Sequence, residues 1–156
     1  MNEICCELPD HTTPPKEIVN ILNTCRRISI VGLSPKEERD SHRVARYLLE
    51  QGYDVVPVNP GQTEILGRTC YKNLLEIPFK VDVVDLFLSP ERVAPVVDQA
   101  IQIGARVIWM QLGVVHNEAA RKARQAGITV VMNRCIKQDH EKWAAGCTPS
   151  GPSPPV

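Results

Sequence analysis

At 156 residues, 43% of them hydrophobic, the chain has the size of one domain with an ordinary buried core and leaves no room for a second. Its 18 basic residues balance its 18 acidic ones, and the net charge of zero excludes the broad electrostatic attraction that nucleic acid or an anionic membrane surface requires. The N-terminus lacks the apolar run of a secretory signal, and no stretch approaches the roughly 18 to 20 apolar residues of a membrane span. We therefore expect a cytoplasmic protein without nucleic-acid or membrane partners.

The predicted elements begin with a helix over residues 18–25, where apolar side chains recur at helical spacing. Strands are expected at five short runs rich in β-branched residues: 28–31, 54–58, 81–88, 106–112 and 128–132. Helical segments lie between them at 41–51, 91–103 and 117–126, the last with Asn117 as its expected N-cap. The segment 59–78 has room for at most one helical turn, near 71–76, so we expect a thin crossover to the third strand.

The strand runs are mostly apolar rather than alternating, which is typical of strands covered on both faces in a parallel sheet. The alternation of strand and helix predicts an α/β fold, a Rossmann-like doubly wound parallel five-stranded sheet in a single domain, most simply in the order 3-2-1-4-5. We expect this domain to span residues 16–143, between a flexible N-terminal segment (1–15) and a proline-rich disordered tail (144–156).

Ligands of such sheets bind at the carboxyl ends of the strands, where the strand order reverses. This rule selects five segments: the loop after Val31 and residues 58–61, 88–90, 111–113 and 133–135. A dinucleotide-binding loop has three glycines, whereas the first loop here has Gly32 only. An NAD-binding fold also has an acidic residue after the second strand, which binds the ribose hydroxyls, whereas this chain has Asn59-Pro60 there. These departures argue against NAD.

A phosphate ligand fits the same loop, because polar and basic side chains precede a helix N-terminus whose amides and dipole favour anions. These side chains are Ser34, Lys36, Arg39 and Ser41. The alternative is a solvated turn, in which the lysine and the arginine pair with the neighbouring acidic residues Glu37, Glu38 and Asp40.

Cysteine and histidine patterns indicate no metal site. The six cysteines are scattered and include no C-x-x-C pair, so we expect reduced thiols: Cys5, Cys6, Cys25, Cys70, Cys135 and Cys147. The four histidines fall in or near polar segments, where a solvated imidazole is the expected state.

Five stretches, in this order and spacing, resemble the small bacterial CoA-binding proteins, a family similar to the N-terminal domain of the succinyl-CoA synthetase α subunit. They read VGLSPKEERDSHRVARYLLEQGYDVVPVNP, ILGRTCY, VDVVDLF, IWMQLGV and GITVVMNRC, and the resemblance covers about residues 17–143. It implies coenzyme A as the ligand.

The resemblance also implies a place for each site residue. The phosphates of coenzyme A would be held by Gly32, Ser34, Lys36, Arg39 and Ser41, with Val44 turned toward the ligand. The nucleotide end would lie against Val58, Asn59 and Pro60, the loop after the third strand would contribute Leu88, Ser89 and Val93, and the pantetheine arm would pass Gln111 and Gly113. At Leu88-Ser89 many relatives carry an arginine, so one phosphate contact of the family is absent here. A neutral Asn59-Pro60 also suits the 3′-phosphate of coenzyme A, which an acidic residue would repel.

No nucleophile with an adjacent base is evident, since Ser34, Ser41, Ser89 and Cys135 have no histidine partner set by the sequence. Asp85 is expected to be buried against a partner or at the strand rim rather than to act as a general base. We therefore expect non-catalytic binding of coenzyme A or an acyl-CoA, in a regulatory or carrier role. Three alternatives stay open: an NAD(P)-binding redox sensor, a detached subunit of an acyl-CoA synthetase, and a scaffold with a vestigial crevice.

Cys135 follows the fifth strand at the rim of the same crevice and begins a last helix, whose N-terminus favours a thiolate. We predict that it forms a mixed disulfide with the thiol of coenzyme A. The alternative is a small apolar side chain that packs under a helix.

Overall fold

The computed structural model describes residues 8–146, in which strands and helices alternate as predicted. The strands are β1 (Arg27–Val31), β2 (Asp54–Val58), β3 (Glu64–Ile65), β4 (Arg68–Thr69), β5 (Val83–Leu86), β6 (Val107–Met110) and β7 (Thr129–Val131). The α-helices are α1 (Pro15–Thr24), α2 (Asp40–Glu50), α3 (Val93–Gln102), α4 (Asn117–Gln125) and α5 (Ile136–Ala144), and short 3-10 turns form at Leu74–Glu76 and Pro90–Arg92. The predicted tail beyond residue 146 and the cysteines Cys5, Cys6 and Cys147 lie outside the described residues.

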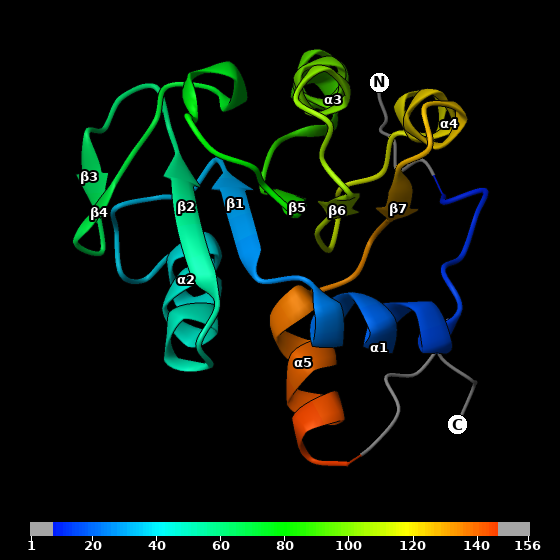
Figure 1. Cartoon of the computed structure of the whole chain (residues 1–156), viewed down its shortest axis with the longest axis horizontal. Coiled ribbons are helices and arrows are strands. Elements are labelled where there is room, and N and C mark those ends of the chain that lie inside the picture. Colours follow the sequence, from blue (N-terminus) through cyan, green and yellow to red (C-terminus); the bar gives the residue numbers. More distant parts are fainter. Residues whose placement is uncertain (1–7, 147–156) are drawn as a thin grey trace.

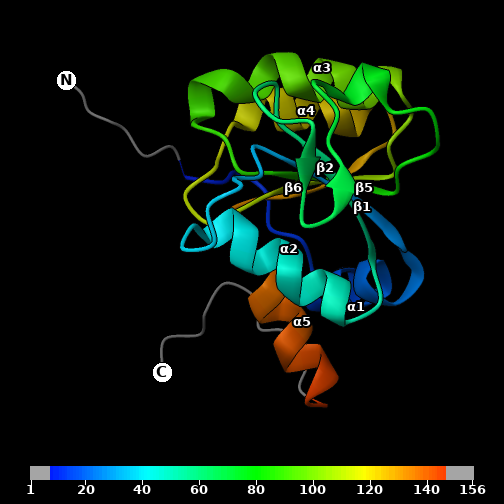
Figure 2. The same ribbon diagram turned by 90° about the vertical axis from the view of Figure 1, so that its left-hand side faces the viewer.

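β1, β2, β5, β6 and β7 form a fully parallel sheet in the order β2-β1-β5-β6-β7. Helices α1, α2 and α5 cover one face, and α3 and α4 cover the other (Figures 1 and 2). The predicted Rossmann-like α/β fold with a doubly wound five-stranded sheet is therefore confirmed. No helix of residues 8–146 combines the length and the apolar character that crossing a bilayer demands.

The predicted strand order 3-2-1-4-5 is wrong in the place of the third strand. In the order of the five predicted strands the sheet reads 2-1-3-4-5, because β5 pairs with the free side of β1 rather than beyond β2. The outer edge of β2 is already occupied: Tyr71 accepts a hydrogen bond from the Asn59 amide at 2.9 Å and donates one to the Pro57 carbonyl at 3.0 Å. The chain then crosses back over the sheet, so that the order reverses between β1 and β5.

The crossover itself is thin, as predicted, with one 3-10 turn at Leu74–Glu76. The small antiparallel pair of β3 and β4, which the sequence pattern did not indicate, lies beside β2 in the same segment.

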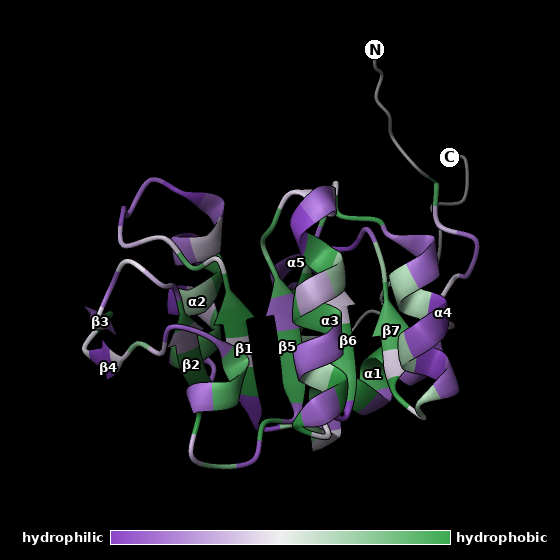
Figure 3. Cartoon of the chain, turned by 90° about the horizontal axis from the view of Figure 1, so that it is seen from above, coloured by the Kyte–Doolittle hydropathy of each residue, from purple (hydrophilic) through white to green (hydrophobic). Residues whose placement is uncertain are grey.

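Each face of the sheet has its own hydrophobic core. Ile30 and Trp109 belong to the core beneath α1, α2 and α5, whereas Ile108 and Met110 belong to the core beneath α3 and α4. Figure 3 shows apolar strands beneath helices whose outer sides are hydrophilic. Burial on both faces explains why the strands are continuously apolar.

Residues 8–14, assigned from the sequence to a flexible segment, make defined contacts with α4 and β7. Asn117 donates a hydrogen bond to the Leu8 carbonyl at 2.7 Å and accepts one from the Asp10 amide at 2.8 Å. Thr13 Oγ1 donates to the Val130 carbonyl at 2.9 Å. The predicted Asn117 cap is wrong, because His116 caps α4 by accepting a hydrogen bond from the Ala119 amide at 3.1 Å.

Candidate functional site

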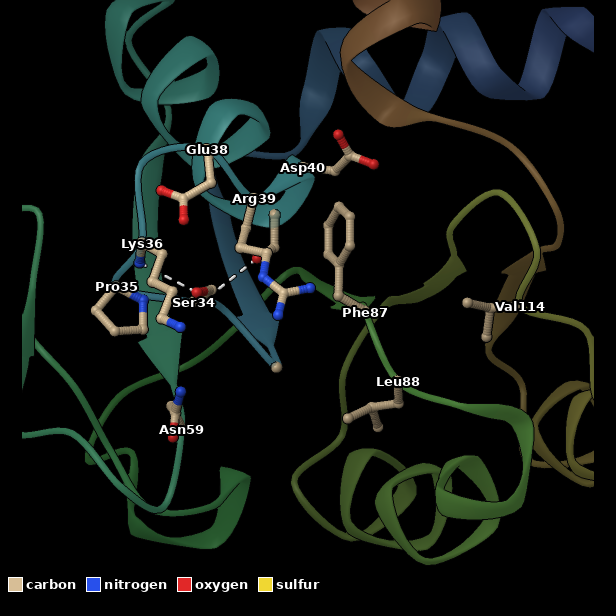
Figure 4. Close-up of a pocket in the computed structure, with 12 residues that line it drawn as sticks. Ser34, Pro35, Lys36, Glu38, Arg39, Asp40, Asn59, Phe87, Leu88 and Val114 are labelled. Atoms are coloured by element: carbon tan, nitrogen blue, oxygen red, sulfur yellow. Dashed lines mark hydrogen bonds between the residues drawn. The ribbon is translucent and has the colours of Figure 1, made fainter.

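A cleft of about 640 Å³, here called the main cleft, opens where β1, β2 and β5 end (Figure 4). Half of its lining comes from the loop between β1 and α2, and the rest from the first turn of α2, the ends of β2 and β5 and the segment after β6. The lining residues are Gly32, Ser34, Pro35, Lys36, Glu38, Arg39, Asp40, Ser41, Asn59, Phe87, Leu88 and Val114. The cleft therefore lies at the point where the strand order reverses, as the sheet rule requires.

Gly32 allows the loop to leave β1 against the end of β5. Its φ is +88°, and a Cβ at this position would lie 2.2 Å from the carbonyl oxygen of Phe87. Its amide donates a hydrogen bond to the Val58 carbonyl at 2.9 Å. The position thus needs both the left-handed conformation and the absence of a side chain.

Short hydrogen bonds hold the loop in shape. Ser41 Oγ accepts from the Ser34 amide at 3.0 Å, and Ser34 Oγ accepts from the Lys36 amide at 3.1 Å. His42 is buried, and its Nδ1 lies 2.9 Å from the Ser34 carbonyl oxygen. The expectation of a solvated imidazole is therefore wrong for His42, which ties the loop to α2.

Lys36 and Arg39 extend from the loop into the main cleft (Figure 4). Neither forms an ion pair with Glu37, Glu38 or Asp40 anywhere in residues 8–146, so the pairing expected of a solvated turn is absent. Glu37 and Asp40 pair instead with arginines of α2, at 3.9 and 3.6 Å. The N-terminus of α2 has no side-chain cap. Two available cations beside an uncapped helix N-terminus form an environment that suits a phosphate.

Asn59 joins the end of β2 to this loop. Its Nδ2 donates to the Leu33 carbonyl at 2.9 Å, and its Oδ1 accepts from the Gly61 amide at 2.8 Å. Asp54, the acidic residue of β2, lies at the opposite end of that strand, where it pairs with Arg27 at 2.8 Å. Within residues 8–146, no carboxylate therefore takes the ribose-binding position at the end of β2.

The same residues offer no metal site, since no group of three or more His, Cys, Asp or Glu side chains among them could hold a metal ion.

A second hollow of about 310 Å³, here called the side cavity, adjoins the main cleft and shares Asp40 and Phe87 with it. Its other lining residues come from α2, the segment after β6 and the start of α5: Arg43, Val44, Gln111, Leu112, Cys135, Lys137 and Gln138. The two hollows meet at these two shared residues, and their linings together are here called the groove.

A buried carboxyl group lies next to the side cavity. Asp85 on β5 is completely buried, and Gln111 Nε2 donates to its Oδ1 at 2.6 Å. Burial raises the pKa of Asp85 to about 8, and the hydrogen bond from Gln111 opposes that rise. The expectation that Asp85 is buried against a partner is confirmed.

Cys135 reaches the side cavity, half-buried at the N-cap of α5. Burial raises the pKa of its thiol, and hydrogen bonds from the Gln138 and Lys137 amides only partly offset this effect. The expected stabilisation of a thiolate by the helix N-terminus is therefore wrong in its net direction, although the predicted placement at the rim of the crevice is correct.

Most of the predicted site residues line one of the two hollows. The lining of the main cleft includes Gly32, Ser34, Lys36, Arg39, Ser41, Asn59 and Leu88, and the lining of the side cavity includes Val44 and Gln111. Five others lie outside both linings: Val58 and Val93 in the hydrophobic core, Pro60 and Ser89 on the surface, and Gly113, whose amide donates to Asn133 Oδ1 at 2.8 Å.

Sequence reasoning missed Phe87, which lines both hollows. Phe87 falls within the third predicted strand, 81–88, but β5 ends two residues before that range does, at Leu86. An aromatic residue near the end of an apolar run was the signal available in the sequence.

The fold and these hollows define a Rossmann-like domain whose loop after β1 presents Lys36 and Arg39 at the switch point of its sheet. The chain belongs to the CoA binding domain family, which matches residues 26–141. This confirms the resemblance drawn from the sequence.

Three relatives show the range of the similarity. The protein YneT of Bacillus subtilis is 38% identical over 124 residues, which cover 80% of this chain and 92% of YneT. A hypothetical protein from Pyrococcus horikoshii, whose structure is solved, is 46% identical, with a TM-score of 0.83, and the match covers 91% of this chain and 98% of that one. An ADP-forming acetate–CoA ligase of Archaeoglobus fulgidus is 24% identical over 137 residues, or 81% of this chain but 20% of the ligase.

Proposed function

We propose that this chain binds coenzyme A or an acyl-CoA in the groove formed by the main cleft and the side cavity, without catalysing a reaction itself. The observation that carries the proposal is the pair of cations, Lys36 and Arg39, that enter the main cleft without carboxylate partners in residues 8–146. Family membership supports the same ligand class. The role we propose for this binding is regulatory or that of a carrier.

The shape of the groove suits the two parts of coenzyme A. Its phosphates match the basic loop and the helix N-terminus of the main cleft, and the neutral Asn59 tolerates the 3′-phosphate. The thiol-bearing pantetheine arm then continues past Phe87 into the side cavity, where Val44 and Gln111 offer apolar and polar contacts.

Ligand-dependent thermal stability tests this proposal. A ligand that binds only the folded state raises the melting temperature, so coenzyme A should raise it while NAD at the same concentration leaves it unchanged. Dephospho-CoA, which lacks the 3′-phosphate, measures what that phosphate contributes. A larger shift with NAD than with coenzyme A would contradict the proposal and favour a dinucleotide-responsive sensor.

A second role is favoured by the similarity to the acetate–CoA ligase, of which this chain matches a fifth. In that role the chain would be the CoA-binding part of an acyl-CoA-forming assembly. Native purification separates the two roles, because both allow either ligand but only the assembly needs a second chain. A protein that co-purifies in fixed ratio would favour the assembly, whereas this chain alone with bound coenzyme A or acyl-CoA would favour a sensor or carrier.

A further inference from the structure

Asp85 is an unusual residue to find in the centre of a parallel sheet. In the sheet register its neighbours are Ile30 on β1 and Trp109 on β6, both fully buried. Its Oδ2 has no hydrogen-bond partner among the described residues, and Oδ1 is bound by Gln111. A buried carboxyl group without a cation is costly, and an apolar side chain of similar volume is often equally stable or more so. Core packing therefore gives no reason for an aspartate here.

Gln111 connects this carboxyl group to the groove. Its backbone is fixed on both sides, since its amide donates to the Leu86 carbonyl at 3.4 Å and its carbonyl accepts from the Val114 amide at 2.8 Å. Its side-chain nitrogen is held by Asp85, and the same side chain lines the side cavity. Within residues 8–146 the Asp85 contact is the one hydrogen bond of the Gln111 side chain, so its Oε1 is available as an acceptor.

We infer that Asp85 is a positioning residue, which holds the amide nitrogen of Gln111 so that Gln111 Oε1 faces the side cavity and accepts a hydrogen bond from an amide N–H of the pantetheine arm. The inference rests on the proposed function. An amide group can present either its oxygen or its NH₂ group to a ligand, and a fixed acceptor behind Nε2 selects the oxygen. The pantetheine arm carries two amide N–H groups, which are donors of the required kind.

Paired ligands and paired variants test the inference by calorimetry. The Asp85→Leu variant removes the acceptor and frees the Gln111 amide, so it should bind coenzyme A roughly threefold to tenfold more weakly than the wild type. Its affinity for adenosine 3′,5′-bisphosphate, which lacks the pantetheine arm, should stay within about twofold, and its melting temperature should equal or exceed that of the wild type. The Asp85→Asn variant keeps an acceptor for Gln111 Nε2 and should bind both ligands as the wild type does.

The Gln111→Leu variant tests the same hydrogen bond independently, and it is sufficient by itself if Asp85→Leu does not fold. It should weaken the binding of coenzyme A by a similar factor. The double variant Asp85→Leu/Gln111→Leu should lose no more affinity than either single variant, because both substitutions act through one hydrogen bond. Unchanged coenzyme A affinity in Asp85→Leu, or an equal loss for both ligands, would overturn the positioning role. Failure of the wild type to bind coenzyme A would instead overturn the proposed function itself.

Discussion

Lys36 and Arg39 define the electrostatic character of the main cleft because the acidic residues beside them in sequence pair elsewhere or not at all within residues 8–146. Replacing Arg39 with alanine should weaken coenzyme A binding by roughly 1.5 to 3 kcal/mol, the scale of a charge-assisted hydrogen bond. The free energy of unfolding should change little, because Arg39 is exposed and its side chain makes no cap to α2. Calorimetric titration and denaturant unfolding of the same samples measure both quantities.

Arg46 is the matched control for this substitution. It lies on α2, the helix that follows Arg39, outside both hollows, and pairs with Glu37 at 3.9 Å. Arg46→Ala removes the same net charge and should leave the affinity unchanged. Equal losses in the two variants would show that overall charge, rather than a phosphate contact, governs binding.

Cys135 lies where a thiol at the end of the pantetheine arm could reach it, in the lining of the side cavity. We predict that oxidised coenzyme A reacts with the Cys135 thiolate to form a mixed disulfide and releases one coenzyme A thiol. Because burial raises the pKa of Cys135, the reaction should be slow at neutral pH and should accelerate as the pH rises.

Peptide mass spectrometry locates the adducts, and the buried Cys25 and Cys70 serve as internal controls. Modification of Cys5, Cys6 or Cys147 with Cys135 unmodified would show that exposure governs this chemistry and that the groove has no redox role.

At the scale of elements, the close approach of β1 to the end of β5 depends on Gly32, which has no Cβ. Gly32→Ala places a Cβ against the Phe87 carbonyl in a left-handed conformation, and we expect a loss of about 3 kcal/mol or more in the free energy of unfolding. Gly104→Ala is the control, because Gly104 also has a positive φ, +72°, but nothing within 4 Å of its Cβ position. It should lose about 1 to 2 kcal/mol. Similar losses in the two variants would mean that the close approach of the strands is unimportant.

The elements could be predicted because local patterns determine them. Apolar runs predict all five strands of the sheet, and the sequence pattern predicts α1 to α4 to within a few residues of their observed ends. The strand order could not be read in the same way, because it depends on Tyr71 pairing with the edge of β2, a contact between segments that periodicity does not relate. The pair β3 and β4 was missed because each strand has two residues, too short for any period to appear.

Site residues that directly follow a strand could be predicted from the sequence. Those whose contribution depends on the direction of the side chain were harder to predict. The loop after β1 and Asn59 could be placed from their positions alone. Whether a residue such as Val58 or Val93 faces the groove or the core depends on the turn of a strand end or a helix, and both side chains turn into the core. Phe87 and the pair of Asp85 with Gln111 join distant segments, so only the folded structure relates them to the groove.

At the scale of the whole molecule, a net charge of zero leaves local groups to set both ligand choice and the response to pH. Where its loop meets α2 the groove presents Lys36 and Arg39, with Glu38 and Asp40 in the same lining. The sheet beneath it carries the Asp85 carboxyl group, whose pKa burial raises to about 8. The charge of that carboxyl group makes the stability of the fold depend on pH in a direction opposite to that of most paired carboxylates.

Burial raises the pKa of Asp85 from 3.8 to about 8, so between these values the folded protein keeps a proton that the unfolded chain has released. The contribution of Asp85 to stability is therefore complete below pH 4 and falls as the pH rises toward 8, by up to about 1.4 kcal/mol per pH unit. Asp85→Asn cannot ionise, so its free energy of unfolding relative to the wild type should increase across this range and level off above pH 8. Urea unfolding of both proteins at a series of pH values measures the difference, and a difference that stays constant from pH 4 to 8 would show that Asp85 titrates normally in the folded state.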